Sequence, residues 1–150
     1  MKYGSLFCFM LLSFLIKAQT GAIPEVAINE IMASNGITQK DPAGEYDDWI
    51  ELYNNTSAGI DLSNWYMSDD YKWKKKWQFP SGSTIAPKGY LIIWCDSQLT
   101  QAGLHSNYKL NKGGEEVMLC KPDTSVIDSI TFGKQRTDTT FARIPNGKGA

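Results

Sequence analysis

One short segment, residues 48–54, constrains the fold more than any other part of the chain. Its sequence, Asp-Trp-Ile-Glu-Leu-Tyr-Asn, alternates so that Ile50 and Leu52 point to one side while Trp49 and Tyr53 point to the other. This period of two, followed by an Asn/Ser/Gly turn, is typical of a central β-strand. We expect Ile50 and Leu52 to face the core, where a fully buried side chain of this kind contributes about 1.5–3 kcal/mol. Trp49 and Tyr53 are expected to cover a second, half-buried face.

The other strand candidates are short and are separated by turn residues. The first, Val26–Met32, has a slipped alternation, because Ile28 and Ile31 cannot share one face of a regular strand. A β-bulge near Asn29-Glu30 would place both side chains inward. Further strands are expected within residues 65–67, 77–79, 90–95, 117–120, 126–132 and 141–144, while 34–48 and 98–110 read as loops. No window has the three-and-four spacing of a long helix, so the sequence predicts an all-β sandwich.

The N-terminal residues 1–18 have the pattern of a secretory signal peptide. Lys2 supplies a small positive charge, an apolar run follows from Leu6 to Ile16, and Ile16-Lys17-Ala18 offers a cleavage site. The apolar run is shorter than the roughly 20 residues that span a bilayer. We therefore predict cleavage after this segment and a protein that is secreted, periplasmic or held at the cell surface.

The predicted mature chain begins at Gln19, with a short linker over residues 19–25 and one domain over residues 26–150. It is long enough for a single core and has no expected transmembrane segment after cleavage. The whole chain carries 15 Lys and Arg against 16 Asp and Glu. Loss of Lys2 and Lys17 leaves a formal charge of about −3. Because an acidic domain has no general attraction for nucleic acid, we expect no such partner.

Two cysteines, Cys95 and Cys120, remain in the predicted mature chain. In an exported protein they would suit one disulfide. The favoured alternative is that both are small buried hydrophobic residues at strand ends. They do not predict a metal site, because there is no CxxC motif and His105 has no partner at ligand spacing.

No catalytic or cofactor-binding set is recognisable in the sequence. Glu30 and Glu51 offer two carboxylates, but nothing indicates a cleft for acid/base chemistry, so we expect them to face solvent or to pair with Arg143. His105 is the single histidine and no nucleophile elbow accompanies it. Neither a phosphate loop nor a dinucleotide fingerprint occurs. The sequence therefore predicts no enzyme, no catalytic residues, no resident metal and no cofactor.

Two charged loops are the remaining candidates for binding. Acidic residues crowd the first loop, at Asp41, Glu45, Asp47 and Asp48. Oxygen ligands spaced in this way suit Ca²⁺, but the EF-hand pattern is absent, so a solvated acidic loop is favoured and Ca²⁺ is the alternative.

The second charged loop, Tyr71–Trp77, interleaves lysines with aromatic residues directly after Asp69-Asp70. Aromatic faces stack on a ligand and lysines neutralise it, which suits an anionic or glycan partner. The favoured alternative is a hairpin-like loop with solvated lysines and an inward-facing Trp77. If the loop binds a partner, the residues expected to do so are Trp73, Lys74, Lys75 and Lys76.

A series of short motifs also follows a characteristic order along the chain. It comprises Ile28-Asn29-Glu30-Ile31, residues 49–54, Leu62-Ser63-Asn64-Trp65, Phe79-Pro80, Lys88-Gly89-Tyr90, Gly114-Glu115-Glu116-Val117, Val126-Ile127-Asp128, Phe132-Gly133 and Arg143-Ile144-Pro145-Asn146-Gly147. No single motif is specific, but the ordered series, which covers nearly all of Val26 to Gly147, resembles the lamin-tail domain.

The resemblance implies an immunoglobulin-like β-sandwich, for which we expect about eight or nine short strands. Eukaryotic members are docking domains in the tails of nuclear lamins, whereas bacterial members are exported and accompany surface-associated hydrolases or other modules. The predicted signal peptide places this chain with the bacterial kind. Such members usually continue beyond the Pro-Asn-Gly turn, so the end at Ala150 implies either an unpaired last edge or a piece of a longer protein.

The function expected from these observations is that of a non-enzymatic interaction module that docks protein or cell-surface polysaccharide. The alternative is an accessory domain of a secreted hydrolase or nuclease whose catalytic part lies outside this chain.

Overall fold

The computed structural model describes residues 22–149, so the predicted signal peptide lies outside the described residues. This part of the chain contains eleven β-strands and no helix, which confirms the all-β expectation. No helix within residues 22–149 is long and apolar enough to cross a membrane. The count exceeds the expected eight or nine because five strands are only two residues long. The strands are β1 (Val26–Met32), β2 (Trp49–Asn54), β3 (Ile60–Asp61), β4 (Tyr66–Ser68), β5 (Trp77–Gln78), β6 (Thr84–Ile85), β7 (Tyr90–Cys95), β8 (His105–Ser106), β9 (Glu115–Cys120), β10 (Val126–Phe132) and β11 (Phe141–Ala142).

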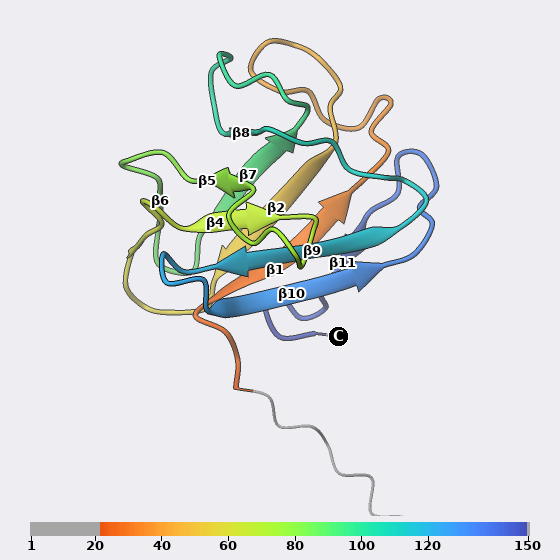
Figure 1. The fold of residues 1–150 in the computed structure, drawn as a ribbon. Coiled ribbons are helices and arrows are strands. Elements are labelled where there is room, and N and C mark those ends of the chain that lie inside the picture. The colour runs from red at the N-terminus through yellow and green to blue at the C-terminus, as the bar shows by residue number, and fades with distance from the viewer. Residues whose placement is uncertain (1–21, 150) are drawn as a thin grey trace, which may run out of the picture.

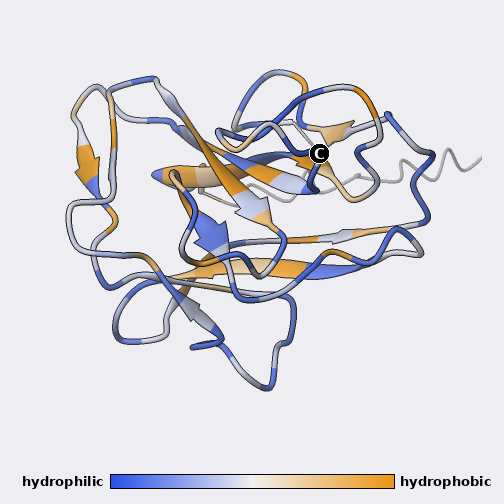
Figure 2. Ribbon diagram, turned by 90° about the horizontal axis from the view of Figure 1, so that it is seen from above, coloured by the Kyte–Doolittle hydropathy of each residue, from blue (hydrophilic) through white to orange (hydrophobic). Residues whose placement is uncertain are grey.

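The strands form two layers, as expected for an immunoglobulin-like sandwich (Figure 1). The larger sheet has the order β11-β1-β2-β7-β8, and the smaller has the order β10-β9-β4-β5. A separate two-stranded ribbon joins β3 to β6. Hydrophobic residues follow the strands while the connecting loops are mostly hydrophilic (Figure 2), so the core lies between the two sheets.

The central strand β2 behaves as its alternation predicts. It pairs with β1 on one side and β7 on the other. Ile50 and Leu52 are fully buried in the core between the sheets, whereas Trp49 packs with Met32 and Trp94 in a second hydrophobic cluster. Tyr53 stacks at a tilt on Tyr90 of β7. Both expected faces of this strand are therefore confirmed.

The predicted β-bulge in β1 is present. The pairing of β1 with β2 shifts register between Ile28 and Glu30, which allows Ile28 and Ile31 to be buried in the same core. The extra residue, Asn29, is buried, and its Nδ2 donates to Glu51 Oε1 at 2.8 Å. Glu51 therefore pairs with a neighbouring amide, and the expectation that Arg143 pairs with one of the strand glutamates is wrong.

Arg143 instead joins the two sheets at their shared edge. One of its terminal nitrogens lies 3.0 Å from Asp128 Oδ1 on β10, and its Nε donates to the Ile28 carbonyl of β1 at 2.9 Å. Asp128 Oδ2 accepts the Ile28 N–H at 2.8 Å. The last strand, β11, follows on the edge of β1 and is shorter than the expected 141–144.

The two cysteines are buried free thiols, so the favoured interpretation is confirmed and no disulfide forms. Burial raises the pKa of the Cys95 thiol far above its ordinary value. Because the thiolate is the reactive form, this residue serves packing rather than chemistry. Next to it, residues 98–110 are irregular as expected, except that β8 pairs in parallel with the end of β7.

Candidate functional site

The loop between β4 and β5 is ordered by a buried hydroxyl. Ser68 Oγ accepts the Asp70 N–H at 3.0 Å and lies 2.9 Å from the Trp73 carbonyl oxygen. Two consecutive turns follow, closed by Trp73 N–H to the Asp70 carbonyl at 3.0 Å and Lys76 N–H to the Trp73 carbonyl at 3.1 Å. The loop therefore presents its side chains from a defined backbone.

The aromatic residues of this loop face in opposite directions. Trp77 is only 6% exposed and packs edge-on against Phe79, with ring centroids 4.7 Å apart, as the hairpin interpretation predicts. Trp73 is 56% exposed and Tyr71 is 42% exposed. Two large aromatic faces are thus available to a partner at the tip of the loop.

The lysines of the loop do not all have the same role. Lys76 Nζ lies 2.5 Å from Asp69 Oδ1 and 5.1 Å from the centroid of the Tyr108 ring, so this cation is already paired within the fold. Lys74 is half-buried, and its Nζ lies 3.4 Å from the Thr124 carbonyl oxygen.

Lys72 and Lys75 are exposed, and the Lys75 ammonium lies over the ring of Tyr66. Of the four residues predicted to bind, the fold therefore leaves Trp73, Lys74 and Lys75 together on the loop and uses Lys76 internally. Tyr71 and Lys72 join them, although neither was among the four.

A second cluster of ionisable residues lies between two loops at one end of the sandwich. The loop that joins β1 to β2 lies beside the segment that joins β7 to β8 (Figure 1), and Gln98 Nε2 donates across to Glu45 Oε2 at 3.0 Å. Ligand atoms of Asp41, Glu45 and Asp47 all lie within 4.8 Å of one another. Ligand atoms of Asp41, Asp96 and His105 meet the same limit.

The acidic cluster consists of Asp41, Glu45, Asp47 and Asp96. It differs in two residues from the acidic loop expected from the sequence, which included Asp48 and not Asp96. Asp48 is not part of it, because its Oδ1 accepts the Asn35 N–H at 3.0 Å. Asp96 is part of it, although it lies at the end of β7, far along the chain from Asp41. Burial raises the pKa of Asp47, and the nearby carboxylates of Asp96, Asp41 and Glu45 raise it further. The cluster is therefore partly desolvated and repels further negative charge.

His105 is buried and both of its ring nitrogens face oxygen acceptors. Nδ1 lies 2.7 Å from Asp96 Oδ2, and Nε2 lies 3.1 Å from the Ala102 carbonyl oxygen. The neighbouring Ser106 hydroxyl donates to the Tyr108 carbonyl at 2.9 Å. A general base needs a ring nitrogen directed at a substrate, whereas here both ring nitrogens contact groups of the fold, and one of them holds the Asp96 carboxylate.

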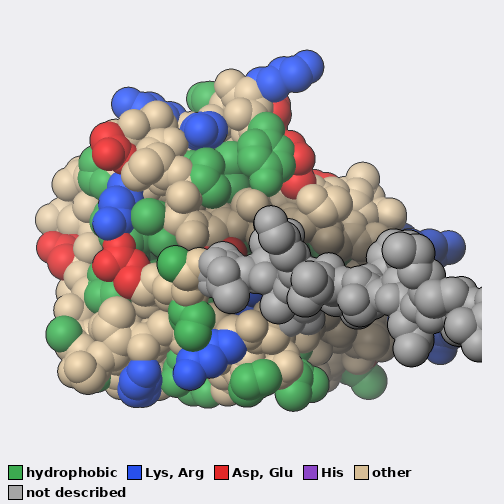
Figure 3. Space-filling model, turned by 90° about the horizontal axis from the view of Figure 1, so that it is seen from below, with side chains coloured by type: hydrophobic (Ala, Val, Ile, Leu, Met, Phe, Trp, Pro, Cys, Tyr) green, Lys and Arg blue, Asp and Glu red, His purple; other side chains and the backbone are tan. Residues whose placement is uncertain are grey.

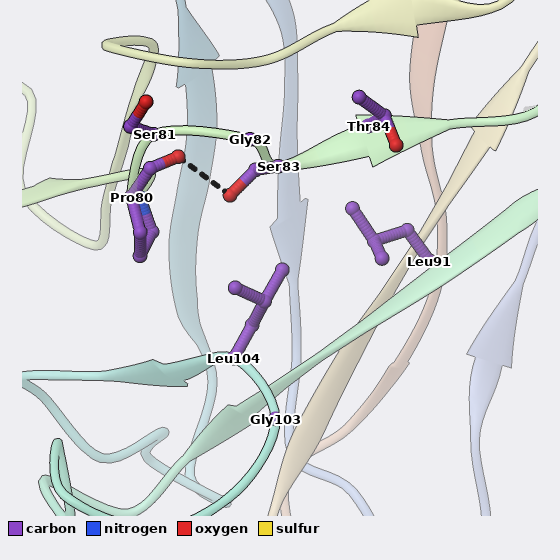
Figure 4. A pocket seen from close by; sticks show the side chains of 8 residues that line it. All are labelled: Pro80, Ser81, Gly82, Ser83, Thr84, Leu91, Gly103 and Leu104. Carbon is purple, nitrogen blue, oxygen red and sulfur yellow. Dashed lines mark hydrogen bonds between the residues drawn. The ribbon is translucent and has the colours of Figure 1, made fainter.

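A hollow of about 420 Å³ opens beside the β3–β6 ribbon (Figure 4). Leu91 and Leu104 point toward it, and the Ser83 hydroxyl donates to the Pro80 carbonyl at 2.8 Å. The remaining lining residues are Ser81, Gly82, Thr84 and Gly103. None of these lining residues carries a carboxyl, imidazole or amine, so the hollow offers packing surface but no acid/base pair.

Charges of both signs are mixed on the face of the domain that is seen from below (Figure 3). On the face shown in Figure 3, Lys and Arg side chains are interspersed with Asp and Glu. Local clusters, rather than a general field, must therefore decide what the domain attracts.

Comparison with known proteins identifies the family. No curated protein matches this chain. A sequence model of the lamin tail domain matches residues 19–134, which is well over half of the chain and includes every strand from β1 to β10. Because the match spans both sheets of the immunoglobulin-like sandwich, the chain belongs to the lamin tail domain family.

Proposed function

We propose that this protein is a non-enzymatic interaction module that acts outside the cytoplasm and docks protein or cell-surface polysaccharide through the loop Tyr71–Lys76. In this proposal the module is of the exported, bacterial kind and is released or displayed after cleavage of residues 1–18. Its membership in a family of immunoglobulin-like interaction domains supports the general role. The main observation that supports this docking site is the 56% exposure of Trp73 on an ordered loop.

An exposed tryptophan on a stiff loop is well suited to binding. Tryptophan is enriched among the residues that dominate interface energies, because it adds a large apolar area with few rotatable bonds. The backbone of the loop is held by Ser68, so little conformational freedom would be lost when a partner binds.

The charges around Trp73 favour an acidic partner. Lys72, Lys74 and Lys75 flank the ring without a carboxylate partner among the four ion pairs of residues 22–149. A polysaccharide that carries uronic acid groups would offer sugar faces to the aromatic rings and carboxylates to the lysines. Contacts made by such exposed lysines weaken with salt, because the screening length shortens to about 8 Å at physiological ionic strength.

The test is binding to an immobilised acidic polysaccharide, polygalacturonate, with neutral dextran as the comparison. We expect salt-sensitive retention of the wild-type protein on polygalacturonate alone. Trp73→Ala and the triple substitution of Lys72, Lys74 and Lys75 by Ser should each abolish it, while Lys76 is left in place to preserve the ion pair with Asp69.

The matched control removes the same charge elsewhere. Lys112, Lys134 and Lys148 are exposed lysines on other loops, and their triple substitution by Ser should leave retention unchanged. Equal loss in both triple variants would mean that net charge, rather than this loop, mediates binding. Retention of the Trp73→Ala variant at the wild-type level would remove the loop as the docking site.

A further inference from the structure

The acidic cluster between the two loops contains buried carboxylate oxygens that have no partner. Asp41 is only 5% exposed. Its Oδ1 accepts the Glu45 N–H at 2.7 Å, whereas its Oδ2 is buried and has no hydrogen-bond partner. Asp47 Oδ2 is also buried without a partner. A buried, ionised oxygen without a partner is costly, and native proteins rarely leave one in that state.

No cation in the described part of the chain forms an ion pair with the Asp41 or Asp47 carboxylate. Among residues 22–149, none of the four ion pairs involves Asp41, Glu45 or Asp47. His105 contacts the Asp96 carboxylate, and a ring nitrogen also lies within 4.8 Å of a ligand atom of Asp41, but the ring forms no ion pair with Asp41, Glu45 or Asp47. Lys109, which pairs with Asp96 through the backbone, forms none of these ion pairs. The cluster therefore holds more negative charge than the surrounding side chains balance.

The ligand atoms that remain available around this charge are oxygens, because the one nearby imidazole, that of His105, is already engaged. The Gln101 amide donates to Glu45 Oε2 at 3.0 Å, and its own Oε1 is buried without a partner. His105 is not free to act as a nitrogen ligand, because both ring nitrogens face acceptors. Zinc prefers nitrogen and sulfur ligands, whereas Ca²⁺ takes six to eight oxygens in an irregular arrangement.

We propose that Asp41, Glu45, Asp47 and Asp96 form a Ca²⁺ site that joins the β1–β2 loop to the β7–β8 segment. Asp41 is the shared member, because its carboxylate lies within 4.8 Å of ligand atoms on both loops. His105 is a positioning residue that holds the Asp96 carboxylate toward the cluster. Gln101 Oε1 is available as a further ligand.

Calcium bound at this position stabilises the folded state, because the ion binds the folded chain and not the unfolded one. The four carboxylates come together only in the fold, so an ion that binds them favours the folded state over the unfolded state. We expect an affinity in the range of extracellular calcium modules, on the order of 10⁻⁴–10⁻³ M.

The experiment titrates chelator-stripped protein with CaCl₂ by isothermal calorimetry and follows thermal unfolding with and without the ion. We expect saturable binding of one ion and a rise in the midpoint of unfolding. Folded wild-type protein that shows neither saturable heat nor a shifted midpoint at millimolar Ca²⁺ would overturn the proposal.

Isosteric variants separate binding from folding. Asp41→Asn keeps the oxygen that accepts the Glu45 N–H, and Asp47→Asn alters a residue that is only half-buried. Each is expected to weaken Ca²⁺ binding by at least about tenfold, since affinity follows the number of charged ligands. In metal-free protein, Asp47→Asn should instead raise the midpoint, because it removes repulsion among carboxylates. The Asp47→Asn variant also keeps the test decisive if Asp41→Asn does not fold.

Two exposed acidic turns provide the control. Asp61 and Asp123 each accept hydrogen bonds from a serine two residues ahead, and Asp61→Asn and Asp123→Asn should bind Ca²⁺ as the wild type does. Wild-type affinity in both Asp41→Asn and Asp47→Asn would show that the ion binds elsewhere and would refute the assigned site.

Discussion

Asn54, the last residue of β2, shows how a buried amide builds the turn that follows it. Its side chain is fully buried; Nδ2 donates to the Ala58 carbonyl at 2.7 Å and to the Ala86 carbonyl at 3.0 Å. Oδ1 accepts the Thr56 N–H at 2.8 Å. One amide thus satisfies backbone groups of two separate turns, which explains why asparagine closes this strand.

Replacement of Asn54 by Ala should therefore destabilise the fold more than the loss of an exposed amide side chain does. It removes the hydrogen bonds to the Ala58 and Ala86 carbonyls, each of which keeps one other donor, and it leaves the Thr56 N–H without its acceptor. For the loss of three buried hydrogen bonds we expect a decrease of about 3 kcal/mol in the free energy of unfolding. Urea unfolding measures it. The control is Asn107→Ala, an exposed amide that donates only to the Lys76 carbonyl at 2.7 Å, and a similar loss in both variants would contradict the role assigned to Asn54.

Glu51 gives a prediction about pH. Burial raises the pKa of this carboxyl above its ordinary value of 4.5. The stability that the group contributes is thus full below pH 4.5 and is lost as the pH rises through the folded-state pKa. Glu51→Gln removes that loss and still offers an oxygen to Asn29, so the variant should be more stable than the wild type at pH 7 and equal to it below pH 4.5. Asp61→Asn is the control, because hydrogen bonds from Ser63 lower the pKa of Asp61. This variant should be less stable than the wild type at pH 7, which is the opposite of the effect expected for Glu51→Gln.

At the scale of elements, sequence pattern predicted those strands long enough to show a period. β1, β2, β7, β9 and β10 all have six or seven residues and were expected. Even the bulge of β1 was detectable, because two isoleucines broke the alternation. The shorter strands β4, β5 and β11 were also expected, at residues 65–67, 77–79 and 141–144. The strands β3, β6 and β8 were missed, because two residues carry no period and their pairing depends on segments that are distant in sequence.

The candidate sites were predictable only to the extent that their residues are adjacent in the chain. The Tyr71–Trp77 loop was visible as a run of lysines and aromatic residues, but the pairing of Lys76 with Asp69 depends on how the loop turns back. The acidic loop was visible as well. Asp96 was not, because only the packing of the β7–β8 segment against that loop brings it to Asp41.

The register of β2 can be tested through Leu52, which is fully buried. Leu52→Ala should cost about 2–5 kcal/mol through lost transfer energy and a residual cavity. Urea midpoints with unchanged slope measure it, and the exposed Ile37 provides a control whose substitution by Ala should stay within about 0.5 kcal/mol. Equal midpoints for wild type and Leu52→Ala would mean that the strand faces the other way.

At the scale of the whole molecule, the ion pair between Asp128 and Arg143 links the two sheets. Both side chains are largely buried. Arg143→Met should cost about 3 kcal/mol, because it leaves the Asp128 carboxylate buried without its cation. The double variant with Asp128→Asn should cost less than the sum of the two single changes, and a double-mutant cycle in urea measures this coupling. Strict additivity would show that the two residues act independently.

Asn55 draws the two ends of the described chain together. Its Nδ2 donates to the carbonyl of Pro24, just before β1, and to the carbonyl of Gly147, just after β11, at 3.0 Å each. Figure 1 shows both described ends on the lower side of the sandwich. A unit whose first and last segments are held by the same side chain can be inserted into a surface loop of a host protein with little stretching of that loop. The geometry of the domain therefore suits insertion within the chain of a carrier protein as well as attachment at its terminus.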